Sequence, residues 1–180
     1  LMMIDTQFEN IATNIKEELK KLGTDTSKFV FNTHWHGDHT GGNPVFGKDA
    51  MIIAHTNVRN RLLTRVGRDG KPSPAPKVAL PMITYDAGLS LHFNGEEIKA
   101  VHFPQGHTDG DSVIFFTKSN VVHLGDDFFV GRFPFVDLNS GGNVEGLVKN
   151  IGELAKMIPS DAKLIPGNGA VSTLDDLKNY

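Results

Sequence analysis

The feature that most constrains this chain is the six-residue segment His34-Trp35-His36-Gly37-Asp38-His39, which directly follows the apolar stretch 28–33. Three imidazoles and a carboxylate this close together are costly to bury, because crowding disfavours ionising more than one or two of them. A divalent metal removes the conflict, since neutral imidazole nitrogen and carboxylate oxygen are ordinary zinc ligands. The first two histidines project together from an extended segment, and the glycine lets the backbone turn before the aspartate and the last histidine. The segment predicts one loop that presents two sets of metal ligands and disfavours the alternative, a solvated loop with a chance cluster of histidines.

Composition sets the broad class of the protein. With 180 residues, 39% hydrophobic and 22% charged, the chain is typical of one soluble globular domain spanning 1–180. The formal net charge is −3 and no stretch concentrates Lys and Arg, so we expect no nucleic-acid partner. The apolar runs are too short to span a bilayer and no signal peptide is evident, so we expect no membrane association and a cytoplasmic or periplasmic location.

The absence of cysteine narrows the chemistry further. With no cysteine in the chain, disulfides, thiolate zinc sites and cysteine nucleophiles are excluded. The chain also starts at Leu1, not at Met, and directly on an apolar run. From this start we expect a processed or truncated N-terminus.

Apolar spacing and turn residues predict the secondary structure. A capping box at Thr6-x-x-Glu9 predicts the start of a helix whose apolar stripe packs in the core and which stops at Gly23. Asn94-Gly95 predicts a two-residue hairpin, and residues 65–77 read as a loop. The stripe consists of Phe8, Ile11, Ile15, Leu19 and Leu22. The other expected helices are 56–64, 144–157 and a short one from about Leu174, and the expected strands are 1–5, 28–33, 51–54, 89–93, 96–103, 112–117, 120–124 and 163–165.

Two later segments place further candidate ligands at strand ends. Residues 106–111 (Gly-His-Thr-Asp-Gly-Asp) lie between two expected strands, and Gly125-Asp126-Asp127 follows another. Loops at strand ends gather around sites on a rigid scaffold, although each segment alone is weak evidence, because a single turn His or Asp is usually solvated. Together with the first loop, they supply a third imidazole for one metal and a carboxylate able to bridge two.

These elements, in this order, resemble the metallo-β-lactamase superfamily from about Met3 to the end of the chain. Its pattern is His-x-His-x-Asp-His, Gly-His-Thr, Gly-Asp and Pro-Gly-His-Gly, and residues 34–39, 106–108 and 125–126 match the first three elements. The resemblance implies an α+β fold, a four-layered αββα sandwich with the site at one edge of the two sheets. The strands and helices expected above are compatible with that fold.

The resemblance also implies a set of ligands. It places one metal on His34, His36 and His107 and a second on Asp38 and His39, with Asp126 bridging the pair. The implied cofactor is one or two zinc ions, with other divalent metals as alternatives. Asp38 takes the catalytic role of holding the nucleophile or the second metal.

The chain departs from the family pattern in two places. Asn168 stands where the family has the histidine of Pro-Gly-His-Gly, and an amide oxygen is a far poorer zinc ligand than imidazole. We therefore expect a weak, absent or altered second metal, with residue 168 contacting the second site or the substrate. Only 33 residues precede His34, fewer than the family usually has. Missing N-terminal strands would expose a sheet edge, so we also expect either preceding residues or a homo-oligomer to cover it.

Other polar and aromatic residues have structural readings. We expect structural or surface roles for four histidines outside the motifs: His55, His92, His102 and His123. Asp127 either orients a ligand or caps a turn. Trp35 and four phenylalanines are candidates for the wall of an apolar pocket, and core packing is an at least equally good interpretation for the phenylalanines. These four are Phe128, Phe129, Phe133 and Phe135. Gly141-Gly142-Asn143 reads as a helix entry.

The leading functional hypothesis is a metal-dependent hydrolase acting on a carbonyl-type small molecule: an ester, thioester, lactone or β-lactam. The bridging Asp and the lack of Cys are more similar to the thioesterase, lactonase and general hydrolase branches of the family than to the cysteine-containing β-lactamases. Two alternatives stay open. One is a degenerate family member that binds without competent catalysis, which Asn168 would favour. The other is a nuclease, which the acidic net charge disfavours.

Overall fold

The computed structural model describes residues 1–67 and 69–180. The chain divides into two compact units, Leu1–Tyr85 and Asp86–Tyr180. The prediction of a single domain over 1–180 concerns how these units join, and it stays a prediction. No helix in the described residues is long and apolar enough to cross a membrane.

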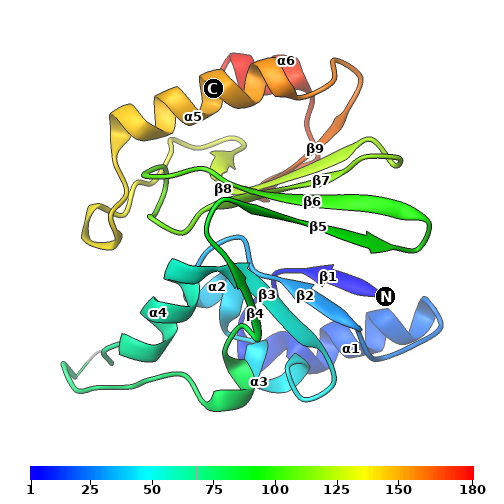
Figure 1. Cartoon of the computed structure of the whole chain (residues 1–180), viewed down its shortest axis with the longest axis vertical. Coiled ribbons are helices and arrows are strands. Elements are labelled where there is room, and N and C mark those ends of the chain that lie inside the picture. Colours follow the sequence, from blue (N-terminus) through cyan, green and yellow to red (C-terminus); the bar gives the residue numbers. More distant parts are fainter. Residues whose placement is uncertain (68) are drawn as a thin grey trace. The chain divides into compact units, whose positions relative to one another are not determined.

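The first unit is built on a parallel four-stranded sheet in the order β1-β2-β3-β4 (Figure 1). Its strands are β1 (Met2–Ile4), β2 (Phe29–Phe31), β3 (Met51–His55) and β4 (Ile83–Tyr85). The α-helices are α1 (Ala12–Lys21), α2 (Gly37–Thr40), α3 (Asn43–Phe46) and α4 (Thr56–Thr64), and the 3₁₀ turns are η1 (Glu9–Ile11) and η2 (Lys77–Ala79). Parallel neighbours require crossover connections, which these helices supply.

Two apolar clusters hold the helices of this unit to its sheet. Ala12 of α1 and Phe46 of α3 pack with Val30 and Ile52 of the central strands. The second cluster joins α4 to β3, to the 65–77 loop and to the segment after that loop, through Ala54, Val58, Leu62, Ala75, Ala79 and Leu80. The β2 strand is buried along its whole length, so the loop that follows it starts from a rigid position.

The second unit is a five-stranded sheet in the order β5-β6-β7-β8-β9. Its strands are β5 (Gly88–Phe93), β6 (Glu96–His102), β7 (Ser112–Phe116), β8 (Val121–Phe129) and β9 (Lys163–Asn168). The first four run antiparallel in turn, and β9 pairs with β8 in parallel. The helices are η3 (Leu138–Ser140), α5 (Val144–Met157) and α6 (Leu174–Lys178).

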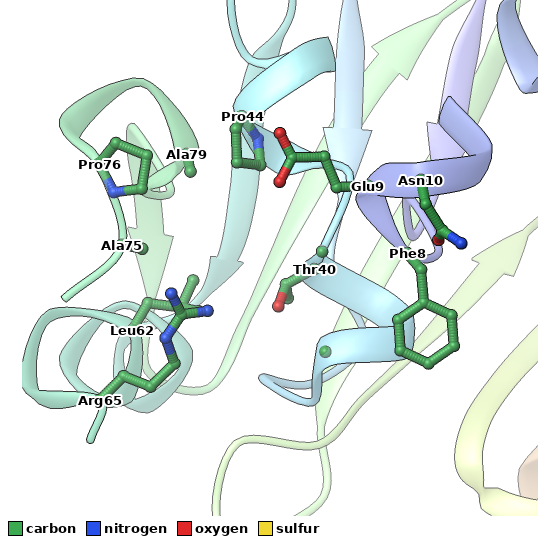
Figure 2. A pocket seen from close by; sticks show the side chains of 12 residues that line it. Phe8, Glu9, Asn10, Thr40, Pro44, Leu62, Arg65, Ala75, Pro76 and Ala79 are labelled. Carbon is green, nitrogen blue, oxygen red and sulfur yellow. The ribbon is translucent and has the colours of Figure 1, made fainter. Parts of the chain in front are cut away.

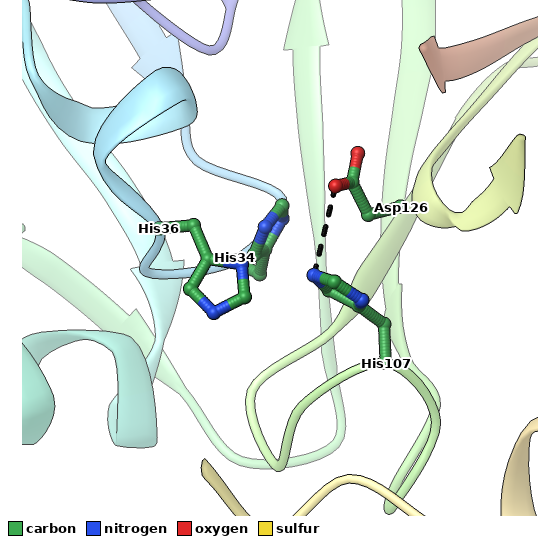
Figure 3. Close-up of side chains that lie close together, drawn as sticks. All are labelled: His34, His36, His107 and Asp126. Atoms are coloured by element: carbon green, nitrogen blue, oxygen red, sulfur yellow. Dashed lines mark ion pairs between the residues drawn. The ribbon is translucent and has the colours of Figure 1, made fainter. Parts of the chain in front are cut away.

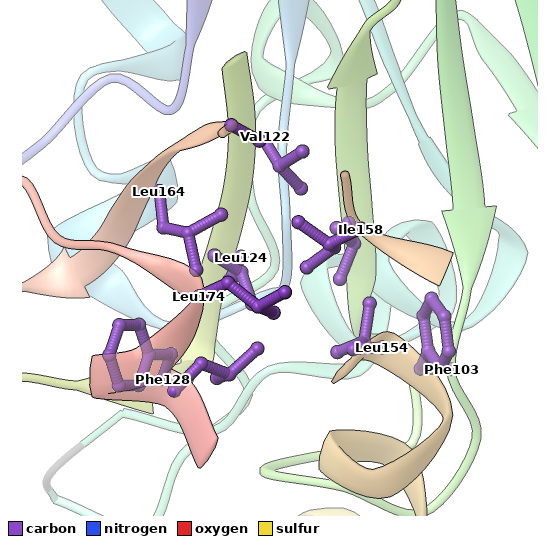
Figure 4. Close-up of a cluster of buried hydrophobic side chains, with 11 residues drawn as sticks. Phe103, Val122, Leu124, Phe128, Leu154, Ile158, Leu164 and Leu174 are labelled. Atoms are coloured by element: carbon purple, nitrogen blue, oxygen red, sulfur yellow. The ribbon is translucent and has the colours of Figure 1, made fainter. Parts of the chain in front are cut away.

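The core of the second unit lies between this sheet and the two α-helices (Figure 4). Leu154 and Ile158 come from α5 and its end, Leu174 from α6, and Leu124 and Leu164 from the strands. Asn143 caps α5 by accepting a hydrogen bond from the Gly146 amide. The segment 141–143 is thus a helix entry, as predicted.

Most of the expected elements are present. The helices 56–64 and 144–157 have the predicted bounds, and the short helix starts at Leu174. Asn94 and Gly95 both have positive φ, 54° and 72°, as a tight two-residue hairpin turn requires. Three further elements, β4, α2 and α3, are only three or four residues long and were not expected from the sequence. Such short elements carry too little periodic signal.

The predicted capping box at Thr6-x-x-Glu9 is wrong. The Thr6 hydroxyl donates to the His39 carbonyl at 3.1 Å or to the Asn43 amide oxygen at 2.9 Å, and η1 has no side-chain cap. The core stripe is also wrong at its two ends, since Phe8 and Leu22 are 52% and 70% exposed. Thr6 is used in a long-range interaction, and such an interaction is invisible in a four-residue pattern.

Three local predictions around the candidate ligands need correction. Asp126 was expected after the end of its strand but lies within β8, and Asn168 was expected in a loop but is the last residue of β9. The pairing of β8 with β9 is irregular between His123 and Phe129, which let the strand run on past Gly125. Gly37 is not needed for the turn, because the turn is the start of α2 and a Cβ there would meet only a Phe8 atom at 4.0 Å.

Candidate metal centre

The first unit presents four candidate ligands directly after the buried strand β2. His34 is buried and His36 is half-buried, and their rings meet edge to face with centroids 4.8 Å apart (Figure 3). Asp38 and His39 follow on α2, which starts after His36. The sequence prediction that one loop carries both sets of ligands is consistent with this placement.

Buried polar groups fix the orientation of two of these rings. The Asp5 carboxylate accepts hydrogen bonds from the Thr33 amide at 2.8 Å and the Thr33 hydroxyl at 2.7 Å. It also lies 2.7 Å from Nδ1 of His39, and the Thr33 oxygen lies 3.1 Å from Nδ1 of His34. Partners at Nδ1 present Nε2 as the ligand atom of each ring, the usual arrangement of metal-binding histidines.

Asp5 was not among the site residues expected from the sequence, which placed it only at the end of a strand. It is buried and has a positive φ of 58°, which is uncommon for a residue other than glycine. A buried carboxylate directly after an apolar strand was the available signal, because such a group needs strong donors.

Asp38 and His39 form the second pair of donors in this unit. Oδ2 of Asp38 lies 3.5 Å from Nε2 of His39. The interaction with the His39 imidazole lowers the pKa of the Asp38 carboxyl below its usual value. Asp38 is therefore ionised at neutral pH and carries the charge that a cation needs.

The second unit presents His107 and Asp126. His107 lies in the loop between β6 and β7, and its Nε2 is 3.6 Å from Oδ2 of Asp126 on β8 (Figure 3). Nδ1 of His107 lies 2.6 Å from the Phe135 carbonyl, so a proton on Nδ1 is donated there and Nε2 is the ligand atom.

Two further buried carboxyl groups hold the His107 loop. The Asp127 carboxyl accepts a hydrogen bond from the His107 amide at 3.1 Å. Asp111 accepts from the Thr108 amide at 2.7 Å and from the Thr108 hydroxyl at 2.5 Å. Of the two roles predicted for Asp127, positioning a candidate ligand is the one that its hydrogen bond supports.

Asn168 lies beside Asp126. Its Nδ2 donates to Oδ1 of Asp126 at 3.2 Å. A carboxylate oxygen only accepts, so the amide must turn its NH₂ group toward Asp126. Residue 168 thus contacts the carboxylate expected to bridge two metals, and it does so as a donor.

The donors fit a metal in their chemistry and spacing. Two ligand atoms on one tetrahedral zinc, each about 2.0–2.2 Å from the ion, lie about 3.4 Å apart. The separations in the two units, 3.5 Å and 3.6 Å, are close to that value. The candidate ligands are His34, His36, Asp38, His39, His107 and Asp126. Asn168 does not fit, because it presents hydrogens.

The remaining histidines belong to the scaffold. Nδ1 of His55 accepts from the Asn57 amide as the N-cap of α4, and Nδ1 of His123 accepts from the Gly125 amide. Nδ1 of His102 lies 2.8 Å from the Asp111 carbonyl, and His92 is exposed on β5. None of the four belongs to a group of potential metal ligands among the described residues.

The aromatic residues have divided roles. Phe128 and Phe129 are buried, as core packing predicts, whereas Phe133 is 95% and Phe135 58% exposed. The His107 ring meets Phe129 and Phe135 edge to face, with centroids 6.0 and 5.7 Å apart. Trp35 packs against the α4 cluster of the first unit.

A pocket of about 480 Å³ in the first unit runs along α2 (Figure 2). Gly37 and Thr40 of that helix and Gly41 directly after it line the pocket, with Glu9 on the η1 side and Arg65 beyond the end of α4. None of the candidate ligands lines this pocket. It is large enough for a small molecule and shares a helix with Asp38 and His39.

Comparison with known proteins identifies the family. The model of the metallo-beta-lactamase superfamily matches residues 1–177. The chain belongs to this superfamily. Hydroxyacylglutathione hydrolase of Synechococcus sp. (strain JA-2-3B'a(2-13)) is 29% identical over 124 residues, which cover 67% of this chain and 42% of that protein. The chain thus spans less than half the length of this curated relative.

Solved structures confirm the fold. The BLEG-1 B3 metallo-beta-lactamase is 21% identical with a TM-score of 0.77, covering 98% of this chain and 85% of that one. TTHA1623 in a di-iron-bound form is 22% identical with a TM-score of 0.71, covering 96% and 83%. The mixed α/β fold of the metallo-β-lactamase type, expected from the motifs, is therefore confirmed.

Proposed function

We propose that the chain is a metal-dependent hydrolase of carbonyl-type small molecules, in which His34, His36 and His107 together hold one zinc ion. The observation that carries the proposal is the family match over residues 1–177, which includes every candidate ligand. The orientation of the His34 and His107 rings by partners at Nδ1 supports it.

The chemistry follows from the donors. The three imidazoles would hold a zinc ion, which would supply hydroxide at neutral pH and polarise a substrate carbonyl. Asp38 is ionised, and we assign its carboxylate to orienting the nucleophile by accepting a hydrogen bond. Asp5 holds His39 through Nδ1 and Thr33 through its hydroxyl, so it keeps the ligand loop in one arrangement.

The substrate class follows from a relative, the composition and the net charge. The name of the relative, hydroxyacylglutathione hydrolase, favours an acyl compound, and the absence of cysteine agrees with the thioesterase, lactonase and general hydrolase branches. The net charge of −3 disfavours nucleic acid. We assign the activity to a thioester, ester or lactone.

The first prediction tests the metal and the activity together. His107→Ala should remove most of the bound zinc, because a site with three protein ligands loses one strong ligand. Loss of a group that only orients a ligand typically lowers activity by roughly 10–100-fold. The rate of hydrolysis of generic thioesters, esters, lactones and β-lactams should fall by more than that, because His107 is itself a proposed ligand. Metal content of the purified protein and initial rates are the measurements.

A matched control is His92→Ala, since His92 is an exposed histidine on β5 in the same unit. It should keep both the metal and the rate. A full equivalent of metal in His107→Ala contradicts the assignment. A wild-type chain that binds zinc and hydrolyses none of the four substrate classes indicates the degenerate alternative.

A further inference from the structure

Asn168 stands on a backbone that leaves its side chain little choice of direction. It ends β9, where it pairs with Phe129 of β8, and its carbonyl accepts a hydrogen bond from the Val130 amide at 3.0 Å. The neighbouring Gly167 packs so closely on the Asp126 carboxylate that a Cβ there would collide with Oδ1. Both partners of the Asn168–Asp126 hydrogen bond are therefore confined.

The two oxygens of Asp126 consequently face different partners. Oδ2 lies 3.6 Å from Nε2 of His107, the spacing of two ligands on one ion, while Oδ1 accepts the hydrogen bond from Asn168. A carboxylate that bridges two cations through both of its oxygens offers one oxygen to each. Here Oδ1 already accepts a hydrogen bond from the Asn168 amide, whose hydrogens carry partial positive charge and oppose a cation at that oxygen.

Turning the amide would not create a good site. It would break the hydrogen bond at 3.2 Å and offer only a neutral oxygen, a weak zinc ligand. The same amide, left as it is, holds the carboxylate with Oδ2 directed at His107. A partner of this kind typically changes metal affinity by about 10–100-fold.

We infer that Asn168 is a positioning residue that makes Asp126 a one-oxygen ligand, so that this chain holds one metal ion tightly where a bridging carboxylate would hold two. The inference rests on the proposed function for the existence of the first metal. Asn168 is thus more than a missing ligand, because its amide raises the affinity for the first metal through Asp126 and also opposes the binding of a second metal.

The test is a titration of the metal-free full chain with Zn²⁺, and with Co²⁺ as a spectroscopic probe, for the wild type and three variants. We expect one tight equivalent in the wild type. Asn168→Asp, the same shape with an acceptor in place of the donor, should add a second equivalent. Asn168→Leu, similar in size without any donor, should keep one equivalent but bind it about 10-fold more weakly and change its Co²⁺ absorption.

The control is Asn14→His, which adds a histidine on the exposed side of α1 and should match the wild type in stoichiometry and affinity. Two tight equivalents in the wild type overturn the inference, and so does wild-type affinity in a folded Asn168→Leu. Circular dichroism establishes that each variant is folded. Metal-free wild type that binds no Zn²⁺ or Co²⁺ at all overturns the proposed function instead.

Discussion

At the scale of single residues, the buried carboxyl pair Asp111 and Asp127 shows how the second unit positions His107. Burial raises the pKa of Asp127 well above its usual value, and the charge of the facing Asp111 raises it further. Burial also raises the pKa of Asp111, although the neighbouring His107 and Thr108 oppose the shift. Burial therefore disfavours the charged form of Asp127, whose carboxyl accepts the hydrogen bond from the His107 amide.

We accordingly predict that Asp127→Asn is nearly neutral for stability. The amide is close in shape to the carboxyl, places no charge in this buried position, and its carbonyl can accept from the His107 amide, so the free energy of unfolding at pH 7 should change by less than about 1 kcal/mol. Asp127→Leu should cost about 1–3 kcal/mol, because it leaves a buried N–H without an acceptor. Urea unfolding of both variants measures this, and equal losses would contradict the role of residue 127 as the acceptor for the His107 amide.

At the scale of elements, two Thr-x-x-acid patterns at expected helix starts, residues 6–9 and 173–176, have opposite outcomes. Thr173 and Asp176 form a capping box at the start of α6, with the Thr173 amide and hydroxyl bonded to the Asp176 carboxylate at 2.8 and 2.7 Å. Thr6 and Glu9 form none, because the Thr6 hydroxyl is bonded to groups far along the chain. A capping pattern is therefore reliable only where no buried partner competes for the hydroxyl.

The box gives α6 a predictable dependence on pH. Hydrogen bonds from the Thr173 hydroxyl and amide lower the pKa of Asp176 below its ordinary value of 3.8. A carboxyl group whose pKa is lower in the folded than in the unfolded protein stabilises the fold at pH values above its unfolded pKa. This stabilisation is lost as the pH falls through its folded pKa. The difference in unfolding free energy between the wild type and Asp176→Asn should thus shrink from about pH 6 to about pH 3. A difference that is constant over this range would contradict the assignment.

At the scale of the whole molecule, β1 is the end strand of its sheet. In the described residues it pairs with β2 alone, and its sequence, Met2-Met3-Ile4, contains neither charge nor proline. Natural edge strands usually carry such features, because an unprotected edge pairs with other chains. We propose that this edge is where copies of the 180-residue chain associate.

The prediction is that the 180-residue chain forms dimers or larger species whose fraction rises with concentration. The Asp5 amide donates to the Phe31 carbonyl of β2. Successive amides of a strand point to opposite sides, so the Met2 amide, three residues earlier, points away from β2. Met2→Pro removes that donor at the first strand position, where proline is tolerated, and should shift the chain toward monomer. Light scattering after size-exclusion chromatography measures both, and a wild type that stays monomeric at all concentrations contradicts the proposal.

The sequence by itself determined the features that depend on neighbouring residues. The ligand-rich segment 34–39, the Asn94-Gly95 hairpin and the helices 56–64 and 144–157 are encoded within a few positions, by donor chemistry, positive φ and apolar period. The residue types of the candidate metal ligands and the family followed from the same local patterns.

Only the tertiary structure decided which distant groups meet. The bond from Asn168 to Asp126 spans 42 positions and the contact of Asp5 with His39 spans 34, so no local pattern announces either. Residue type allowed Asn168 to donate or to accept, and the confined end of β9 beside an obligate acceptor made it a donor. The physical reason is that a side chain's role is set by the partner it is buried against, and packing between sequence-distant elements chooses that partner.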